Sequence, residues 1–144
     1  MLLGVRHAGL IVSDMEKSVD FYVNKIGFQV LQDFWDGSEG INNLAGTSGM
    51  NVHMVKMKSP DGSVIELLKY YGDEVSYERN YNKLYSVGEA HIAIQVKNAK
   101  EFFNHCHKNG IETLSEPIKS NEGIAYVFFI FDPDRYRVEV VEII

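Results

Sequence analysis

The sequence is poor in cysteine and has no long hydrophobic run, and each shortage excludes a class of protein. A single cysteine, Cys106, cannot form an internal disulfide, so a disulfide scaffold is excluded and a reducing cytoplasm is expected. No apolar run approaches the roughly 20 residues that span a bilayer. The apolar first residues lack the basic start and the small-residue cleavage site of a signal peptide. We therefore expect a cytoplasmic protein without a membrane partner.

Positive charge is also in short supply. The chain carries 14 Lys and Arg against 20 Asp and Glu, a net charge of −6, which argues against nucleic acid as a partner. No low-complexity tract or Pro/Gly-rich linker is present. Cys106 lies between His105 and His107 on a predicted surface helix. We interpret it as an ordinary thiol rather than a nucleophile, because no strand-borne base accompanies it.

The chain does contain an internal repeat. Residues 6–14 and 90–98 are each a strand that starts with a histidine, His7 or His91, and ends in polar residues suited to cap a helix. A helix follows in both copies, over about 15–25 and 99–108, and each stops at a glycine. The expected buried stripes are Val19, Tyr22, Val23 and Ile26 in the first helix, and Phe102, Phe103 and Cys106 in the second.

The spacing within the two copies is nearly equal. His7 lies 20 residues before Gly27, and His91 lies 19 residues before Gly110. A further strand is expected after each glycine, over residues 28–31 and 111–114. Residues 34–47 make the first copy longer and are rich in Gly and Asn, so we interpret them as a mobile or ligand-facing loop.

The ends of the copies also match. Residues 59–67 and 132–140 each place a glutamate, Glu66 or Glu139, six residues after a proline. We predict an α+β fold of two tandem βαβββ modules, about 4–70 and 89–143, joined by a tyrosine-rich connector, 71–88. Residues 1–144 are expected to form a single domain.

Each module offers one histidine and one glutamate as candidate metal ligands: His7, Glu66, His91 and Glu139. Strand alternation predicts that all four side chains point away from the helices. A lone carboxylate buried in the apolar strand around Glu66 would cost several kcal/mol unless it were paired. Two imidazoles and two carboxylates suit Zn, Ni, Co, Mn or Fe, with positions left for substrate if the ion is five- or six-coordinate.

Taken one at a time, such residues are more often solvated or structural than ligands. Their duplication at matched positions is what favours a metal site. His53 lies outside the repeat and is interpreted as a strand side chain.

At these residues the chain resembles the vicinal oxygen chelate superfamily of glyoxalases, bleomycin-resistance proteins and dioxygenases. The resemblance rests on "HAGLIVSDMEKSVDFYVNKIGF", "SPDGSVIELLKYY", "GEAHIAIQV" and "DPDRYRVEVVE". It implies paired modules that form a partly open mixed β-barrel, with the helices outside, around a divalent metal ion. It also implies Glu66 and Glu139 as ligands beside His7 and His91, and a homodimer.

The His/Glu/His/Glu set looks most like bacterial glyoxalase I, a lactoylglutathione lyase. The resemblance implies a lyase or isomerase acting on a small hemithioacetal-type substrate through a metal-stabilised enediolate, with Glu139 and Glu66 as catalytic residues. The family's glutathione arginine, however, is replaced by Ile11, and the glycine of its "DPDG" turn by Arg135. The alternatives are an epimerase of methylmalonyl-CoA type, a metal-free binding or resistance protein, and an Fe(II) dioxygenase.

Overall fold

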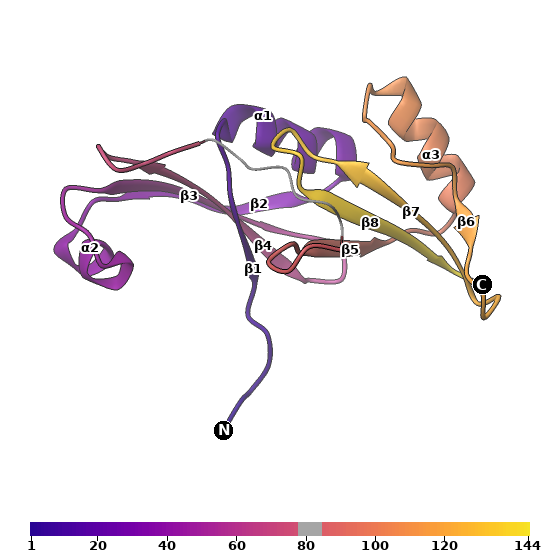
Figure 1. The fold of residues 1–144 in the computed structure, drawn as a ribbon, viewed down its shortest axis with the longest axis horizontal. Coiled ribbons are helices and arrows are strands. Elements are labelled where there is room, and N and C mark those ends of the chain that lie inside the picture. Colours follow the sequence, from indigo (N-terminus) through magenta and orange to yellow (C-terminus); the bar gives the residue numbers. More distant parts are fainter. Residues whose placement is uncertain (78–84) are drawn as a thin grey trace. The chain divides into compact units, whose positions relative to one another are not determined.

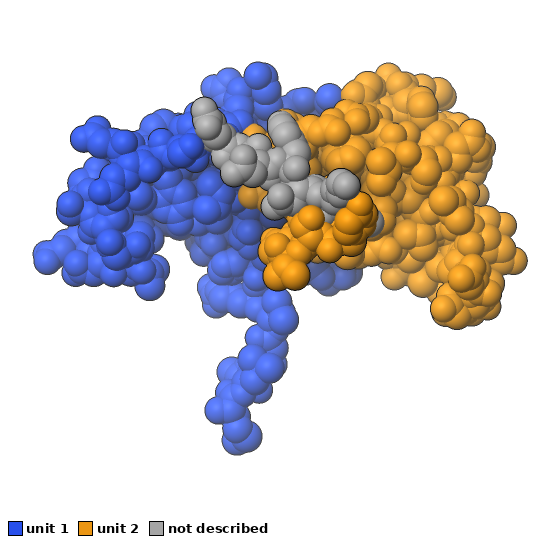
Figure 2. All heavy atoms as spheres, in the orientation of Figure 1, with its two compact units in different colours: residues 1–79 blue, residues 80–144 orange. Residues whose placement is uncertain are grey.

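The computed structural model describes residues 1–77 and 85–144, so part of the predicted connector 71–88 lies outside the described residues. The chain divides into two compact units, Met1–Arg79 and Asn80–Ile144 (Figure 2). In the described part of the chain, no helix has the length and apolar character needed to cross a membrane.

Unit 1 is built on a four-stranded mixed sheet. Its strands are β1 (Ala8–Ile11), β2 (Gln29–Asp36), β3 (Asn51–Lys58) and β4 (Val64–Tyr71), in the order β1-β4-β3-β2 (Figure 1). β1 runs parallel to β4, whereas the other neighbours are antiparallel. The parallel pair places the first and last strands of the module side by side, and these are the strands predicted to carry its two ligands.

Unit 2 repeats this arrangement. Its strands are β5 (His91–Gln95), β6 (Ile118–Lys119), β7 (Ala125–Phe131) and β8 (Arg137–Ile143), in the order β5-β8-β7-β6. The two βαβββ modules predicted from the repeat are thereby confirmed. The strand predicted over 111–114 is wrong, because only Thr113 pairs there, with Ile130. Pro117 has no backbone N–H to continue the ladder, and β6 begins after it.

The first helix differs from the prediction in its geometry. α1 (Met15–Val19) continues into a π-helix, η1 (Asp20–Ile26), which ends at Gly27 with φ 106°. The Asp14 side chain caps α1 by accepting from the Lys17 N–H at 3.1 Å. The wider turn rotates the buried face, so its buried residues are Met15, Ser18, Phe21 and Tyr22. The predicted stripe was right for Tyr22 and wrong for Val19, Val23 and Ile26, which are only half-buried.

The second helix, α3 (Ala99–Lys108), has the predicted bounds and packs against β8 (Figure 1). The Asn98 side chain caps it by accepting from the Glu101 N–H at 2.9 Å. Phe103 and Cys106 are buried as predicted, and Phe102 is half-buried. The burial of the Cys106 thiol raises its pKa to about 11.

Residues 34–47, predicted as a loop, are largely regular. β2 continues to Asp36, and α2 (Glu39–Ala45) follows, capped by Ser38 and ended by Gly46 at φ 69°. The Asn42 amide is buried, accepts from the Met50 N–H at 2.8 Å and donates to the Met50 carbonyl at 3.0 Å. These hydrogen bonds of Asn42 hold α2 against the start of β3.

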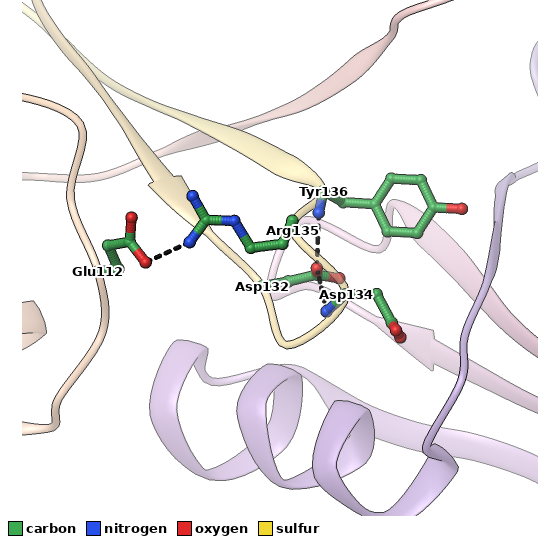
Figure 3. A network of polar contacts seen from close by, with 5 residues as sticks. All are labelled: Glu112, Asp132, Asp134, Arg135 and Tyr136. Atoms are coloured by element: carbon green, nitrogen blue, oxygen red, sulfur yellow. Dashed lines mark hydrogen bonds and ion pairs between the residues drawn. The ribbon is translucent and has the colours of Figure 1, made fainter. Parts of the chain in front are cut away.

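A polar network shapes the turn before β8 (Figure 3). The buried Asp132 carboxylate accepts from the backbone N–H groups of Asp134 and Tyr136 at 2.9 and 2.8 Å. Arg135 adopts φ 65°, a left-handed conformation that its counterpart in the first module, Gly62, adopts at φ 90°. An ion pair with Glu112 and a contact with the Phe131 ring, 4.1 Å from the guanidinium carbon to the ring centroid, hold Arg135 there.

Candidate metal centre

Strand register places the predicted ligands on the faces opposite the helices. In unit 1, Leu10 and Leu67 are paired neighbours and both are buried, whereas Ile11, next along β1, is 51% exposed. Glu66 alternates with Leu67 and so occupies the face of Ile11 rather than that of the helix. In unit 2, Val138 and Val140 are buried, and Glu139 lies between them on the other face.

The unit 1 pair is tightly enclosed. The Nε2 atom of His7 lies 3.0 Å from Oε2 of Glu66, whose side chain is only 8% exposed. The second carboxylate oxygen, Oε1, lies 3.4 Å from Nζ of Lys56, its register partner on β3. Lys56 is therefore the partner that offsets the cost of burying this carboxylate.

Lys56 was not singled out by the sequence reasoning. The signal was present, because Lys56 shares the alternating face of β3 with the buried Val52 and Met54. Cross-strand pairing with Glu66 could not be read without the register of β3 and β4.

The unit 2 pair is more open. The Nε2 atom of His91 lies 3.1 Å from Oε2 of Glu139, and the two side chains are 41% and 25% exposed. Phe129 supports the imidazole edge-on, with ring centroids 5.4 Å apart. Within the parts of the chain that the structure describes, the other oxygen of Glu139 has no hydrogen bond or ion pair. The two glutamates thus differ: Glu66 is held at both oxygens and Glu139 at one.

The donor separations fit adjacent ligands of a metal ion. Two donors bound at about 2.1 Å with a right angle between them lie about 3.0 Å apart. The His–Glu separations of 3.0 and 3.1 Å match this value, and they equally fit a direct imidazole–carboxylate hydrogen bond. Across residues 1–77 and 85–144, three or more His, Cys, Asp or Glu side chains are nowhere grouped to hold an ion. Each pair therefore supplies two donors within its own unit, and their union on one ion stays a prediction.

His53 takes no part in either pair. It lies on β3, where its Nε2 atom is 2.6 Å from Oδ1 of Asp33 and its ring stacks on Trp35 at 4.5 Å between centroids. Its register partner is Lys69, so it occupies the face of β3 and β4 opposite Lys56 and Glu66. The interpretation of His53 as a strand side chain is confirmed.

Arg137 is a second charged residue that the sequence reasoning missed. It opens β8 opposite His91, on the face of Glu139, and pairs with Glu89 at 2.8 Å. Both side chains are largely buried. This pair fixes the start of the strand that carries Glu139.

Comparison with known proteins agrees with this architecture. The uncharacterized protein YwkD of Bacillus subtilis is 33% identical over 145 residues, covering 99% of this chain and 98% of that protein. A lactoylglutathione lyase of Neisseria meningitidis is 29% identical over 138 residues, covering 94% of this chain and 88% of that protein. A crystal structure of a glyoxalase family protein from Bacillus cereus matches 100% of this chain and 96% of its own, with a TM-score of 0.89 at 18% identity.

The family-level match spans both units. Residues 4–140 match the Glyoxalase/Bleomycin resistance protein/Dioxygenase superfamily, a range that includes both His–Glu pairs. The fold, the repeat and this match lead to one conclusion: the chain belongs to the Glyoxalase/Bleomycin resistance protein/Dioxygenase superfamily.

Proposed function

We propose that the protein is a divalent-metal-dependent lyase or isomerase that moves a proton between adjacent carbons of a small oxygenated substrate. The observation that carries the proposal is the duplicated His–Glu pair, present at matched strand positions in both units with almost equal donor separations. Superfamily membership and the lactoylglutathione lyases among the relatives support it.

The four side chains have different roles in the proposed reaction. His7, His91, Glu66 and Glu139 would hold the ion, which when bound would polarise the carbonyl and hydroxyl oxygens of the substrate. Glu139 accepts the proton from carbon and returns it to the neighbouring carbon, because its unengaged oxygen and greater exposure leave it able to reach substrate. Glu66, held by His7 and Lys56, keeps a fixed orientation.

We propose a hemithioacetal-type substrate without assigning glutathione as its thiol. The relatives named lactoylglutathione lyase point to this substrate class. In this chain the family's glutathione arginine is Ile11, an exposed apolar side chain on the face of Glu66. We also propose that the protein is cytoplasmic and forms a homodimer. Light scattering of the purified protein would test the dimer through its molar mass.

The test combines metal analysis with proton exchange. Elemental analysis is expected to find a divalent ion, and loading with Ni, Co, Zn or Mn is expected to give turnover of a hemithioacetal. Glu139→Gln should lower kcat by about 100-fold to 10,000-fold while metal content is retained. His105→Gln, on α3, is the control and should leave both unchanged. Protein that binds none of these ions would refute the proposal.

A metal-free binding protein is the second candidate, and one observation favours it. Lys56 already neutralises Glu66, so the unit 1 pair needs no ion for its burial. This candidate predicts tight binding of a small molecule to protein treated with EDTA. An epimerase would instead return the proton to the same carbon, so it would invert the configuration there and exchange that hydrogen with deuterium from solvent without changing the connectivity of the substrate.

A further inference from the structure

Residues 2–6 form an exposed apolar arm that precedes β1 (Figure 1). The side chains of Leu2, Leu3 and Val5 are each at least 89% exposed. The pairing of β1 with β4 begins only at Ala8, so in the described part of the chain no strand lies beside the arm. Several neighbouring aliphatic side chains that are exposed in this way indicate a segment that binds another surface.

The edge of the unit 1 sheet at β2 also has no neighbouring strand. In the order β1-β4-β3-β2, the described strands leave β2 paired with β3 alone, and seven of its eight residues are exposed. After a bulge between Val30 and Gln32, the register of residues 32–36 is regular, and these residues include no proline or lysine. Phe34 and Trp35 are exposed on the two faces of this stretch. The outer side of β2 can therefore accept a further strand.

The arm and the edge of β2 are complementary in length, polarity and charge. Residues 2–6 and 32–36 are both five residues long, and both segments expose apolar side chains. The arm has one charged residue, Arg6, and none of the described residues forms an ion pair with it. The edge has only negative charges, Asp33 and Asp36. Each of these carboxylates accepts a hydrogen bond at Oδ1, and the Asp33 side chain is still 60% exposed. An added arm would bring a guanidinium group near them.

The arm cannot pair with β2 of its own sheet. β1 and β2 are the two edge strands, three strand spacings apart, which is a distance of about 14 Å. Five extended residues span about 17 Å, so crossing the end of the sheet would use nearly the whole arm. No residues would remain to run along β2. The arm of one molecule can, however, pair with β2 of another.

We propose that residues 2–6 of one copy of the chain add as a further strand to β2 of a second copy, and that the exchange is reciprocal. Reciprocal exchange pairs both arms and both edges at once, so the assembly closes at two copies. The inference rests on the homodimer proposed above and specifies its interface. It is independent of the proposed metal-dependent reaction.

Light scattering over a dilution series tests the role of the arm. The wild type is expected to be a dimer, and Leu2→Ser combined with Leu3→Ser should raise the dissociation constant about 10-fold or more. Leu44→Ser is the matched control, because Leu44 on α2 is 83% exposed and lies outside both segments, and it should leave the dissociation constant unchanged. Circular dichroism should be the same for all three proteins, because these leucines are exposed within each copy.

Cross-linking of two differently tagged copies tests the edge of β2. One copy carries Leu3→Cys and the other carries Gln32→Cys, so only a contact between molecules can join them. A short bis-maleimide should give a product with the mass of one copy of each. The native Cys106 is buried and should react little. Leu114→Cys replaces Gln32→Cys in the control, because Leu114 is exposed on unit 2, and it should give little product.

The possible failures are distinguishable. A wild type that is monomeric at every concentration would overturn the proposed homodimer and this inference together, and the proposed reaction would be unaffected. A dimer that survives the two leucine substitutions would overturn this inference alone. Cross-linking at Gln32→Cys no greater than at Leu114→Cys would do the same.

Discussion

The contact between Lys56 and Glu66 predicts a coupling energy that a double-mutant cycle can measure. At 3.4 Å, with an effective dielectric constant of about 20, the Coulomb attraction is about 5 kcal/mol. The cost of withdrawing both groups from water cancels part of this, and we expect a coupling of about 2 kcal/mol in metal-free protein. Lys56→Met and Glu66→Gln should each destabilise the fold, and the double variant should lose less than their sum.

The assay is urea unfolding in the presence of EDTA. Trp35 is the only tryptophan of the chain and lies on β2, so its fluorescence reports on the unit that holds the pair. Circular dichroism follows the whole chain as a second probe. Lys69→Met combined with Glu66→Gln is the control cycle, because Lys69 lies on the other face of β4, and its coupling should be near zero. A coupling below about 0.5 kcal/mol for Lys56 and Glu66 would refute the reasoning, because the ammonium would then be paired with water.

Three further predictions concern stability. Gly62→Ala should lower the free energy of unfolding by about 1 kcal/mol, because alanine is strained in the left-handed backbone at φ 90°. Arg135→Gly should change the free energy of unfolding less, because the relief of backbone strain is offset by loss of the contacts with Glu112 and Phe131. Urea unfolding of both variants measures the two changes. The pKa of Cys106 is about 11 in the folded protein, above its value in the unfolded chain, so the fold should lose stability as pH rises from about 9 toward 11. Cys106→Ala should remove this loss of stability. A thiol reagent at pH 8 should label the folded wild type far more slowly than the unfolded chain. Asn42→Ala should cost about 2 kcal/mol by leaving the Met50 backbone groups unpaired, and Asn43→Ala, on the same helix, should cost much less.

The repeat made most of the fold predictable. Two copies of one pattern, each with a histidine at the start and a glutamate at the end, predicted two βαβββ modules with one His–Glu pair in each. The parallel pairing found in the structure places His7 near Glu66 and His91 near Glu139. Alternation in β1, β4, β5 and β8 was enough to assign the face of each ligand. These inferences depend on local periodicity, which a sequence records directly.

The features that the sequence did not predict depend on strand pairing and on side-chain packing. The interaction of Lys56 with Glu66 exists only because β3 pairs with β4 in one register, and a shift of one residue would have moved Lys56 to the other face. The helix that carries Cys106 was described as a surface helix because its outer face is polar, although Cys106 itself was correctly assigned to the buried stripe. Residues 34–47 were mistaken for a loop because their content of Gly and Asn is typical of loops. The Asn42 side chain is instead hydrogen-bonded to the backbone of Met50, which a sequence does not reveal.

The π-helix at Asp20–Ile26 accounts for the difference in length between the two copies. In the first copy Gly27 lies 13 positions after the helix cap Asp14, and in the second Gly110 lies 12 positions after the helix cap Asn98. A turn closed by a bond from the Gly27 N–H to the Tyr22 carbonyl, five residues back, accommodates one residue more than an α-helical turn. The one additional residue of the first copy is therefore accommodated within the helix. The neighbouring strands kept their alignment, and His7 and Glu66 still face each other as His91 and Glu139 do.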